Sequence, residues 1–173
     1  MNYFFTEEQL MVRDLARRVA EEKIRPLRAE CDEKAQFSWD VVKVLRESDL
    51  FGIYIAEEFG GLGGGVIELC LAVEEMSRVC GGLSLSLAAT ALATFPIILF
   101  GTAEQKRAYL PKLAQGSSLA AFALTEPEAG SDAGSTKTVA RKDGDSYVLN
   151  GTKCFITNGG VADIFTVVAM TDK

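Results

Sequence analysis

The sequence contains no histidine among its 173 residues. This absence excludes a Ser/His/Asp or Cys/His nucleophilic site, an imidazole general base and a His-ligated zinc centre from the chain. Any chemistry here must use carboxylates, hydroxyls, amides, thiols or a bound cofactor. The length suits one domain, or two small ones if the composition changes partway along the chain.

Cysteine is scarce and widely spaced. Cys31, Cys70, Cys80 and Cys154 form neither a C-x-x-C pair nor a dense disulfide scaffold. The amino terminus also lacks the basic flank and apolar stretch of a secretory signal peptide. We therefore expect reduced thiols in a cytoplasmic protein.

Positive charge is limited as well, since 18 Lys and Arg residues face 24 Asp and Glu residues and the net charge is -6. No basic run is long enough to follow a phosphate backbone. The sequence therefore argues against a nucleic-acid partner.

The stretch over residues 79–103 has no charged side chain, and its length raises the question of a membrane span. Gly81, Gly82 and Pro96 interrupt the stretch, and Ser and Thr hydroxyls dilute it. We expect no membrane span. We predict instead a central helix that is apolar on every side because it is buried on every side.

Helix start signals recur along the first two thirds of the chain. Two capping boxes, which begin at Thr6 and Thr102, each precede a helical pattern. Pro26 is expected to end or kink the first helix. Further helices are predicted after a cap at Ser38 and over residues 66–79.

A glycine-rich stretch occupies residues 60–65. It lacks the Lys-Ser/Thr pair of a P-loop, and it follows the acidic residues 56–59 where a dinucleotide-binding loop would follow an apolar strand. Because it fits neither phosphate-binding template, we expect a flexible connector.

After about residue 117, alternation and turn pairs replace the helical stripe. Short β-prone runs are predicted at 136–141, 146–149, 152–157 and 164–170. This hairpin series is too short to close a barrel unaided. The predicted fold class is α+β, with an all-helical domain over 1–117 followed by the start of an antiparallel β-barrel-like domain over 118–173.

The segment over 121–135 has the richest chemistry. An apolar run leads into a loop of small residues, in which Gly130 and Gly134 permit close backbone approach and Thr125 and Ser131 supply hydroxyls. Such a loop can cradle a phosphate with its backbone N–H groups. From the spacing alone, an ordinary surface turn explains it equally well.

Together with residues 150–159, this segment closely resembles the two flavin-contacting signatures of the acyl-CoA dehydrogenase family. Residues 96–116 resemble the stretch that precedes those signatures. The resemblance implies an FAD-dependent enzyme that oxidises an acyl-CoA thioester to the trans-2-enoyl-CoA. Its electrons would pass to an electron-transferring flavoprotein, and the complete protein would be a homo-oligomer, either a dimer or a tetramer.

The resemblance assigns FAD contacts to four residues of the first signature. Phe122, Ala123, Leu124 and Thr125 match the strand whose backbone and Thr hydroxyl hydrogen-bond the pyrimidine edge of the flavin. The helix over about 87–95 matches the floor of the substrate pocket. There Leu92 and Phe95 favour a short or compact acyl group.

The resemblance assigns further contacts after that strand. Gly130 and Ser131 match the loop at the FAD pyrophosphate, and Ser131 is also within reach of the bound thioester substrate. Thr157 matches the hydroxyl that bonds flavin N5, next to Ile156. Phe155 takes an aromatic position where the family more often has Trp, and so keeps the apolar wall without the indole N–H.

In the family, a glutamate on the carboxy-terminal helical domain abstracts the substrate proton. The resemblance does not extend to that domain, so we expect no catalytic base in this chain and no activity from it alone. The acidic side chains that could replace the base are predicted to be solvated charges: Glu57, Glu58, Glu74, Glu75, Glu126 and Glu128.

Two alternatives stay open at this point. One is an acyl-CoA oxidase or another flavoenzyme of the same fold, which rapid reaction of the reduced flavin with oxygen would distinguish. The other is a non-catalytic helical binding module, which absence of flavin absorbance in the purified protein would favour.

Overall fold

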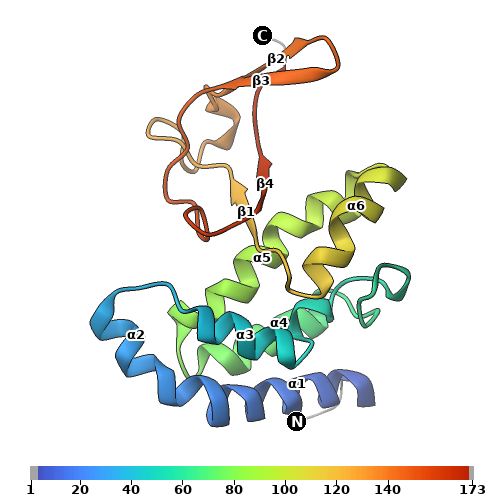
Figure 1. Cartoon of the computed structure of the whole chain (residues 1–173), viewed down its shortest axis with the longest axis vertical. Coiled ribbons are helices and arrows are strands. Elements are labelled where there is room, and N and C mark those ends of the chain that lie inside the picture. The colour runs from blue at the N-terminus through green and yellow to red at the C-terminus, as the bar shows by residue number, and fades with distance from the viewer. Residues whose placement is uncertain (1–3, 172–173) are drawn as a thin grey trace.

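The computed structural model describes residues 4–171. The chain is elongated, with a helical region at one end and a small β region at the other (Figure 1). The helices are α1 (Glu7–Val19), α2 (Arg28–Lys34), α3 (Trp39–Glu47), α4 (Val66–Ser77), α5 (Gly81–Phe100) and α6 (Ala103–Ala114). The strands are β1 (Ala120–Ala123), β2 (Val139–Asp143), β3 (Ser146–Asn150) and β4 (Ile164–Val167).

The predicted helix starts are confirmed. The Thr6 hydroxyl accepts from the Gln9 backbone at 3.3 Å, and the Gln9 side chain accepts in return from the Thr6 backbone at 3.1 Å. Before α2 the backbone passes through a π turn and then a 3₁₀ turn that contains Pro26, because proline cannot donate the α-helical hydrogen bond. Ser38 caps α3 through the Val41 backbone.

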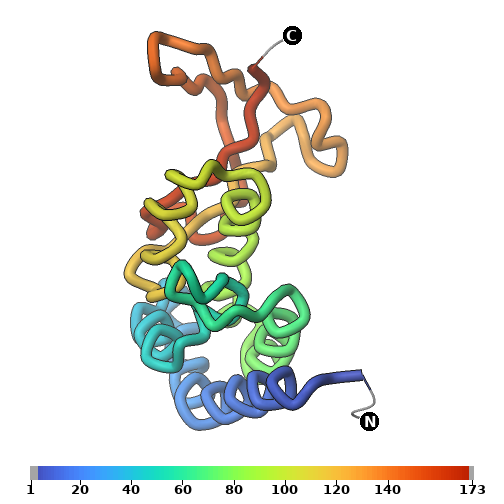
Figure 2. The backbone as a smooth tube through the Cα atoms, turned by 90° about the vertical axis from the view of Figure 1, so that its right-hand side faces the viewer, coloured from blue at the N-terminus to red at the C-terminus, as the bar shows by residue number. Residues whose placement is uncertain are grey.

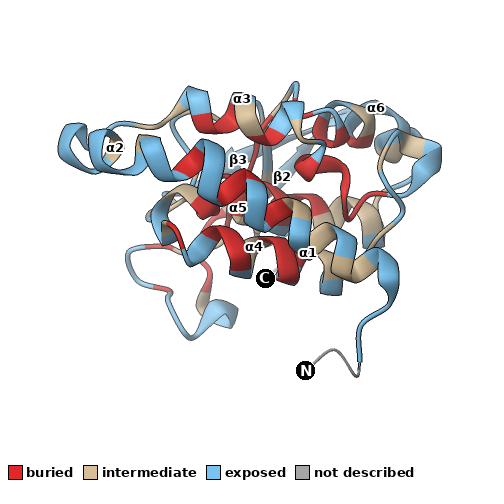
Figure 3. Ribbon diagram, turned by 90° about the horizontal axis from the view of Figure 1, so that it is seen from below, coloured by how far each residue is buried: buried red, intermediate tan, exposed pale blue. Residues whose placement is uncertain are grey.

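The helical region has one apolar core, which forms where α1, α3, α4 and α5 meet. Its largest side chains, including Leu45, Phe51, Met76 and Leu87, are completely buried. Seen from below, the buried residues lie on the inward faces of these helices and the exposed residues on their outer faces (Figure 3). This one-sided burial is what the helical spacing of apolar residues predicts.

The glycine-rich connector between α3 and α4 is closely packed, so the expected flexibility is wrong. The Leu62 N–H donates to the Gly52 carbonyl and the Gly63 N–H donates to the Ile55 carbonyl, both at 2.9 Å. A Cβ atom at Gly61 would lie 2.0 Å from that Ile55 oxygen. Glycine is therefore needed here for close backbone packing.

The central helix α5 is buried on one side and open on the other. Thr90 and Ala93 are completely buried, whereas Leu92 is 54% exposed and Leu99 is 65% exposed. The expectation that α5 is buried all round is therefore wrong. Gly81, Gly82 and Pro96 lie within the helix instead of interrupting it. By length and composition α5 could cross a membrane, with a mean hydropathy of 2.0, yet other helices and β1 pack on its closed side.

The β region differs in part from the prediction. β2 and β3 form the expected antiparallel hairpin, but β1 and β4 pair in parallel. The predicted strand over 152–157 is absent, because Phe155 has a φ of 57° and turns the backbone out of the extended conformation. Within residues 4–171 the strands form two separate two-stranded sheets and close no barrel.

Candidate functional site

A groove of about 460 Å³ lies between the open side of α5 and the β region. Its lining comprises Leu85, Ala88, Ala89, Leu92, Phe122, Leu124, Thr125, Phe155, Ile156 and Thr157. The walls are apolar except for two threonine hydroxyls, and no charged side chain lines them. A flat, largely apolar molecule with a few polar edge atoms suits such a groove.

The floor of the groove comes from one face of α5. Leu85, Ala88, Ala89 and Leu92 follow the spacing i, i+3, i+4 and i+7, which places them on the same side of a helix. The alanine pair leaves room between the two leucines. Phe95, predicted to lie at the floor of the substrate pocket, does not line this groove and packs against Tyr54 with ring centroids 5.6 Å apart.

Strand β1 presents an open backbone edge. Its Ala123 carbonyl accepts from the Val168 N–H at 3.0 Å on the β4 side. Because successive residues of a strand direct their backbone groups to opposite edges, those of Phe122 and Leu124 face away from β4. Among residues 4–171 the Leu124 N–H has no hydrogen-bond partner. An unused donor is thus available where β1 reaches the groove.

The segment 154–157 lies alongside the end of β1, although the two are far apart in the sequence. The Cys154 N–H donates to the Thr125 carbonyl at 2.9 Å. Phe155 follows in a left-handed conformation with 92% of its surface exposed. An exposed aromatic side chain in this backbone region is uncommon, which marks the position as a candidate contact for a ligand.

Asn158 anchors the other end of that segment. It has a φ of 65°, and its side-chain amide donates to the Thr90 hydroxyl on α5 and to the Ala120 carbonyl on β1, each at 3.2 Å. Asparagine tolerates the left-handed region better than most residues do. Its contacts fix the segment against both α5 and β1.

A buried ion pair stands beside the groove. The Lys153 ammonium lies 2.8 Å from a Glu126 oxygen, and 12% and 3% of the two side chains are exposed. The pKa of Glu126 is lowered to about 2. The hydrogen bond from Lys153 has the largest effect, and the Thr138 hydroxyl and the backbone N–H groups of Lys137 and Thr138 add to it. The prediction that Glu126 is a solvated loop charge is therefore wrong.

Glu75 also departs from its predicted solvated state. It is buried between Arg17 at 2.7 Å and Arg78 at 3.1 Å, which hold the pKa of its carboxyl below the usual range. Neither Glu75 nor Glu126 lines the groove. Glu57, Glu58, Glu74 and Glu128 are exposed, as predicted.

The groove brings together six of the nine predicted flavin contacts, namely Phe122, Leu124, Thr125, Phe155, Ile156 and Thr157. Ala123 is buried away from it. Gly130 and Ser131 lie outside it on the exposed loop after Glu126. A Cβ atom at Gly130 would meet nothing within 4 Å, and the Ser131 hydroxyl has no hydrogen-bond partner among the described residues. Both positions are accessible to a ligand.

Sequence reasoning missed two parts of this arrangement. Leu85, Ala88 and Ala89 could have been found from the helical spacing that leads to Leu92. The supporting Glu126–Lys153 pair gives no such signal, because its members are 27 residues apart and meet only in the folded chain.

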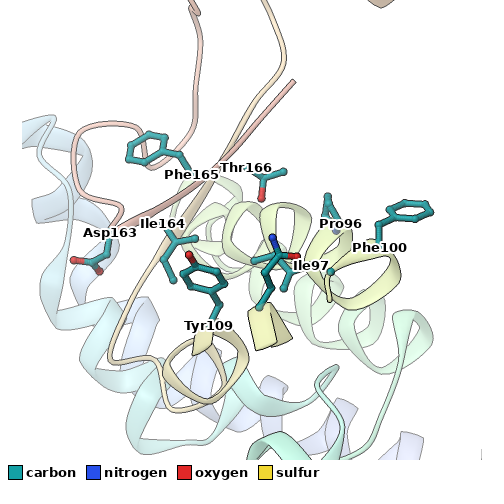
Figure 4. A pocket seen from close by; sticks show the side chains of 10 residues that line it. Pro96, Ile97, Phe100, Tyr109, Asp163, Ile164, Phe165 and Thr166 are labelled. Atoms are coloured by element: carbon teal, nitrogen blue, oxygen red, sulfur yellow. The ribbon is translucent and has the colours of Figure 1, made fainter. Parts of the chain in front are cut away.

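A second groove, of about 420 Å³, lies further along α5. Pro96 and Ile97 of α5, Tyr109 of α6 and Phe165 and Thr166 of β4 surround it (Figure 4). It includes none of the predicted flavin contacts. Within residues 4–171 no cluster of three or more Cys, Asp or Glu residues could hold a metal ion.

Comparison with known proteins assigns both parts of the chain. A family model described as acyl-CoA dehydrogenase, N-terminal domain, matches residues 6–117. A second, described as acyl-CoA dehydrogenase, middle domain, matches residues 121–173. The short-chain-specific acyl-CoA dehydrogenase of Clostridium acetobutylicum is 47% identical over 174 residues, which cover 100% of this chain and 46% of that protein.

Two solved structures are similar throughout the chain. Butyryl-CoA dehydrogenase from Megasphaera elsdenii gives a TM-score of 0.91 at 42% identity, covering 100% of this chain and 46% of that one. A glutaryl-CoA dehydrogenase from Mycobacterium smegmatis in complex with FADH2 gives 0.89 at 31% identity, covering 97% and 44%. The chain therefore spans less than half the length of these relatives. Since its helical region and its β region match consecutive domains of one family, the chain belongs to the acyl-CoA dehydrogenase family.

Proposed function

We propose that the groove between α5 and the β region binds the flavin ring of FAD. The complete protein would oxidise an acyl-CoA to the trans-2-enoyl-CoA and pass the electrons to an electron-transferring flavoprotein. The observation that carries the proposal is that both signature segments, separate in the sequence, meet over an apolar helix face. The relative bound to FADH2 supports the choice of cofactor.

The residues of the groove fit a flavin. The apolar face of α5 and Phe155 offer flat contacts to a ring system, and the unused Leu124 N–H offers a donor to a carbonyl oxygen at the ring edge. Thr125 and Thr157 add hydroxyls within the same groove. The accessible Ser131 lies on a loop that can approach the pyrophosphate and the thioester.

When bound, the flavin would supply the hydride acceptor for the oxidation. The work of this chain is to bind and orient it, because the groove has no carboxylate to abstract a proton. Glu75 and Glu126 are held ionised by cationic partners, and neither faces the groove. We therefore place the catalytic base outside the chain, which would be inactive alone.

The organisation of the complete protein is part of the proposal. We place the boundary between the helical domain and the partial β-domain at residue 117, which the limits of the two family matches support. We place the protein in the cytoplasm and propose a homo-oligomer, either a dimer or a tetramer. The exposed Leu99 and Phe100 support the oligomer, because they offer apolar contact surface at the end of α5.

The experiment is an FAD titration of protein expressed from the complete coding sequence, stripped of flavin and followed by flavin fluorescence. Replacing both groove hydroxyls, as Thr125→Val with Thr157→Val, should weaken binding by about thirtyfold, since two hydrogen bonds at roughly 1 kcal/mol each sum to about 2 kcal/mol. Phe165→Ala, in the second groove, is the matched control and should bind as the wild type does. Equal losses in both variants would contradict the assignment of the site.

The activity has its own readout. The flavin-loaded protein should reduce an electron-transferring flavoprotein when an acyl-CoA is added, with formation of the 2-enoyl-CoA measured by chromatography. Reduction of oxygen at a comparable rate would identify an oxidase instead. A purified protein that neither binds nor retains flavin would refute the proposal.

A further inference from the structure

We infer that Glu126 and Lys153 are positioning residues, which join the two flavin-facing segments into one unit. This inference rests on the proposed FAD site. Glu126 immediately follows the groove residue Thr125, and Lys153 stands two residues before Phe155. Neither side chain lines the groove, so any effect on the flavin must pass through the backbone segments that they hold.

The first half of this arrangement is the set of hydrogen bonds by which Glu126 closes the loop that carries Gly130 and Ser131. The Glu126 carboxylate accepts the Lys137 N–H at 2.6 Å and the Thr138 N–H at 2.9 Å, and also accepts the Thr138 hydroxyl. One side chain at the start of the loop therefore fixes its far end. The loop can then keep its shape while its tip stays exposed.

The second half fixes the segment after β3. The Lys153 ammonium donates to a Glu126 oxygen and to the Leu124 carbonyl, both at 2.8 Å. The next N–H, of Cys154, donates to the Thr125 carbonyl. These contacts hold the segment in register with the end of β1. Because Phe155 is the next residue after Cys154, they also fix where its backbone lies.

The two halves share the same carboxylate, so displacement of either segment disturbs the other. Burial makes the coupling strong, because a buried charge that loses its partner retains neither water nor a counter-ion. Glu75 is the appropriate comparison, since it is equally buried and also paired with cations. Its partners Arg17 and Arg78 belong to the helical region, away from the groove.

The experiment compares Lys153→Gln, Glu126→Gln and the matched control Glu75→Gln in protein from the complete coding sequence. FAD affinity and the visible circular dichroism of bound flavin are measured beside the thermal midpoint. Lys153→Gln and Glu126→Gln should each weaken FAD binding by about tenfold or more and change the flavin spectrum. Glu75→Gln should lower the midpoint but leave affinity and spectrum unchanged. Lys153→Arg, which keeps the charge, should restore much of the affinity.

The outcomes separate this inference from the proposed function. If the wild type binds no FAD, the proposed site fails. If the wild type binds FAD and both variants bind it equally well with an unchanged spectrum, the positioning role is overturned while the site stands. The same holds if Glu75→Gln matches their effect on the flavin.

A second measurement needs no variant and serves if the substitutions prevent folding. FAD should slow amide hydrogen exchange at Lys137 and Thr138, which bond Glu126, together with exchange at Cys154. The amides of Lys137 and Thr138 and the amide of Cys154 should gain protection over the same range of FAD concentration. Protection of one group without the other would overturn the coupling.

Discussion

The helical region and the β region are stabilised in different ways. The first buries large side chains such as Leu45, Phe51 and Met76 in a continuous core. After Leu119, the buried apolar side chains of the second are all alanines, and every residue of β3 is exposed. The β region is instead ordered by specific polar contacts and by docking on α5, as when Thr166 donates to the Ala93 carbonyl at 2.8 Å. The course of the backbone, seen from the side in Figure 2, shows this region extending beyond the helices.

The difference explains why the candidate site lies where it does. A closed core leaves no room for a cofactor, whereas a region held by hydrogen bonds can leave an apolar face of α5 and an edge of β1 open. The same contrast predicts that substitutions in the helical region will act through loss of apolar burial, and that substitutions in the β region will act through loss of hydrogen bonds.

The largest expected effect is in the helical core. Phe51→Ala should lower the free energy of unfolding by about 3 to 5 kcal/mol, because it removes a completely buried ring and leaves a cavity. Leu149→Ala on β3, where the side chain is 51% exposed, should change it by about 0.5 kcal/mol or less. Urea unfolding followed by far-ultraviolet circular dichroism measures both. Similar decreases in the free energy of unfolding of the two variants would contradict the view that the two regions are stabilised in different ways.

A smaller effect is expected where the regions meet. Asn158→Ala deprives the Ala120 carbonyl and the Thr90 hydroxyl of a donor, and should lower the free energy of unfolding by about 1 to 3 kcal/mol. Asn158→Gly loses the same bonds but accepts the left-handed backbone, so it should be the less damaging of the two. If Asn158→Ala lowered the free energy of unfolding no more than Asn158→Gly does, the left-handed backbone at this position would contribute nothing to the difference in stability.

How far the sequence predicts the molecule follows from the same contrast. The helix starts at Thr6, Ser38 and Thr102 were predictable because caps and apolar spacing are local signals. The parallel pairing of β1 with β4 was not, since it depends on contacts across about forty residues and on the turn that Phe155 imposes. The Glu126 environment was hidden for the same reason: its partners Thr138 and Lys153 are distant in sequence.

Acid should destabilise the fold through both buried carboxylates, Glu126 and Glu75. The pKa of Glu126 is about 2 in the folded chain against an ordinary value of 4.5, so its stabilising effect is complete above 4.5 and is lost as the pH falls toward 2. Glu126→Gln should therefore make the unfolding midpoint fall less steeply over this pH range. Glu75→Gln should act in the same direction, since Arg17 and Arg78 hold the pKa of Glu75 below its ordinary value. Identical slopes in the wild type and Glu126→Gln would contradict the depressed pKa.

The smallest effect tests whether the helical region is specified locally as well as by its core. The Thr102 hydroxyl accepts from the Gln105 backbone at 3.2 Å, and the Gln105 side chain accepts from the Thr102 backbone at 2.8 Å. Thr102→Ala should lower the free energy of unfolding by about 1 kcal/mol, and Thr102→Ser, which keeps the oxygen, should stay close to the wild type. Because the cap is exposed, burial cannot account for a loss confined to alanine. Equal stability of the two variants would mean that packing of Leu110 and Leu113 alone holds α6 in place.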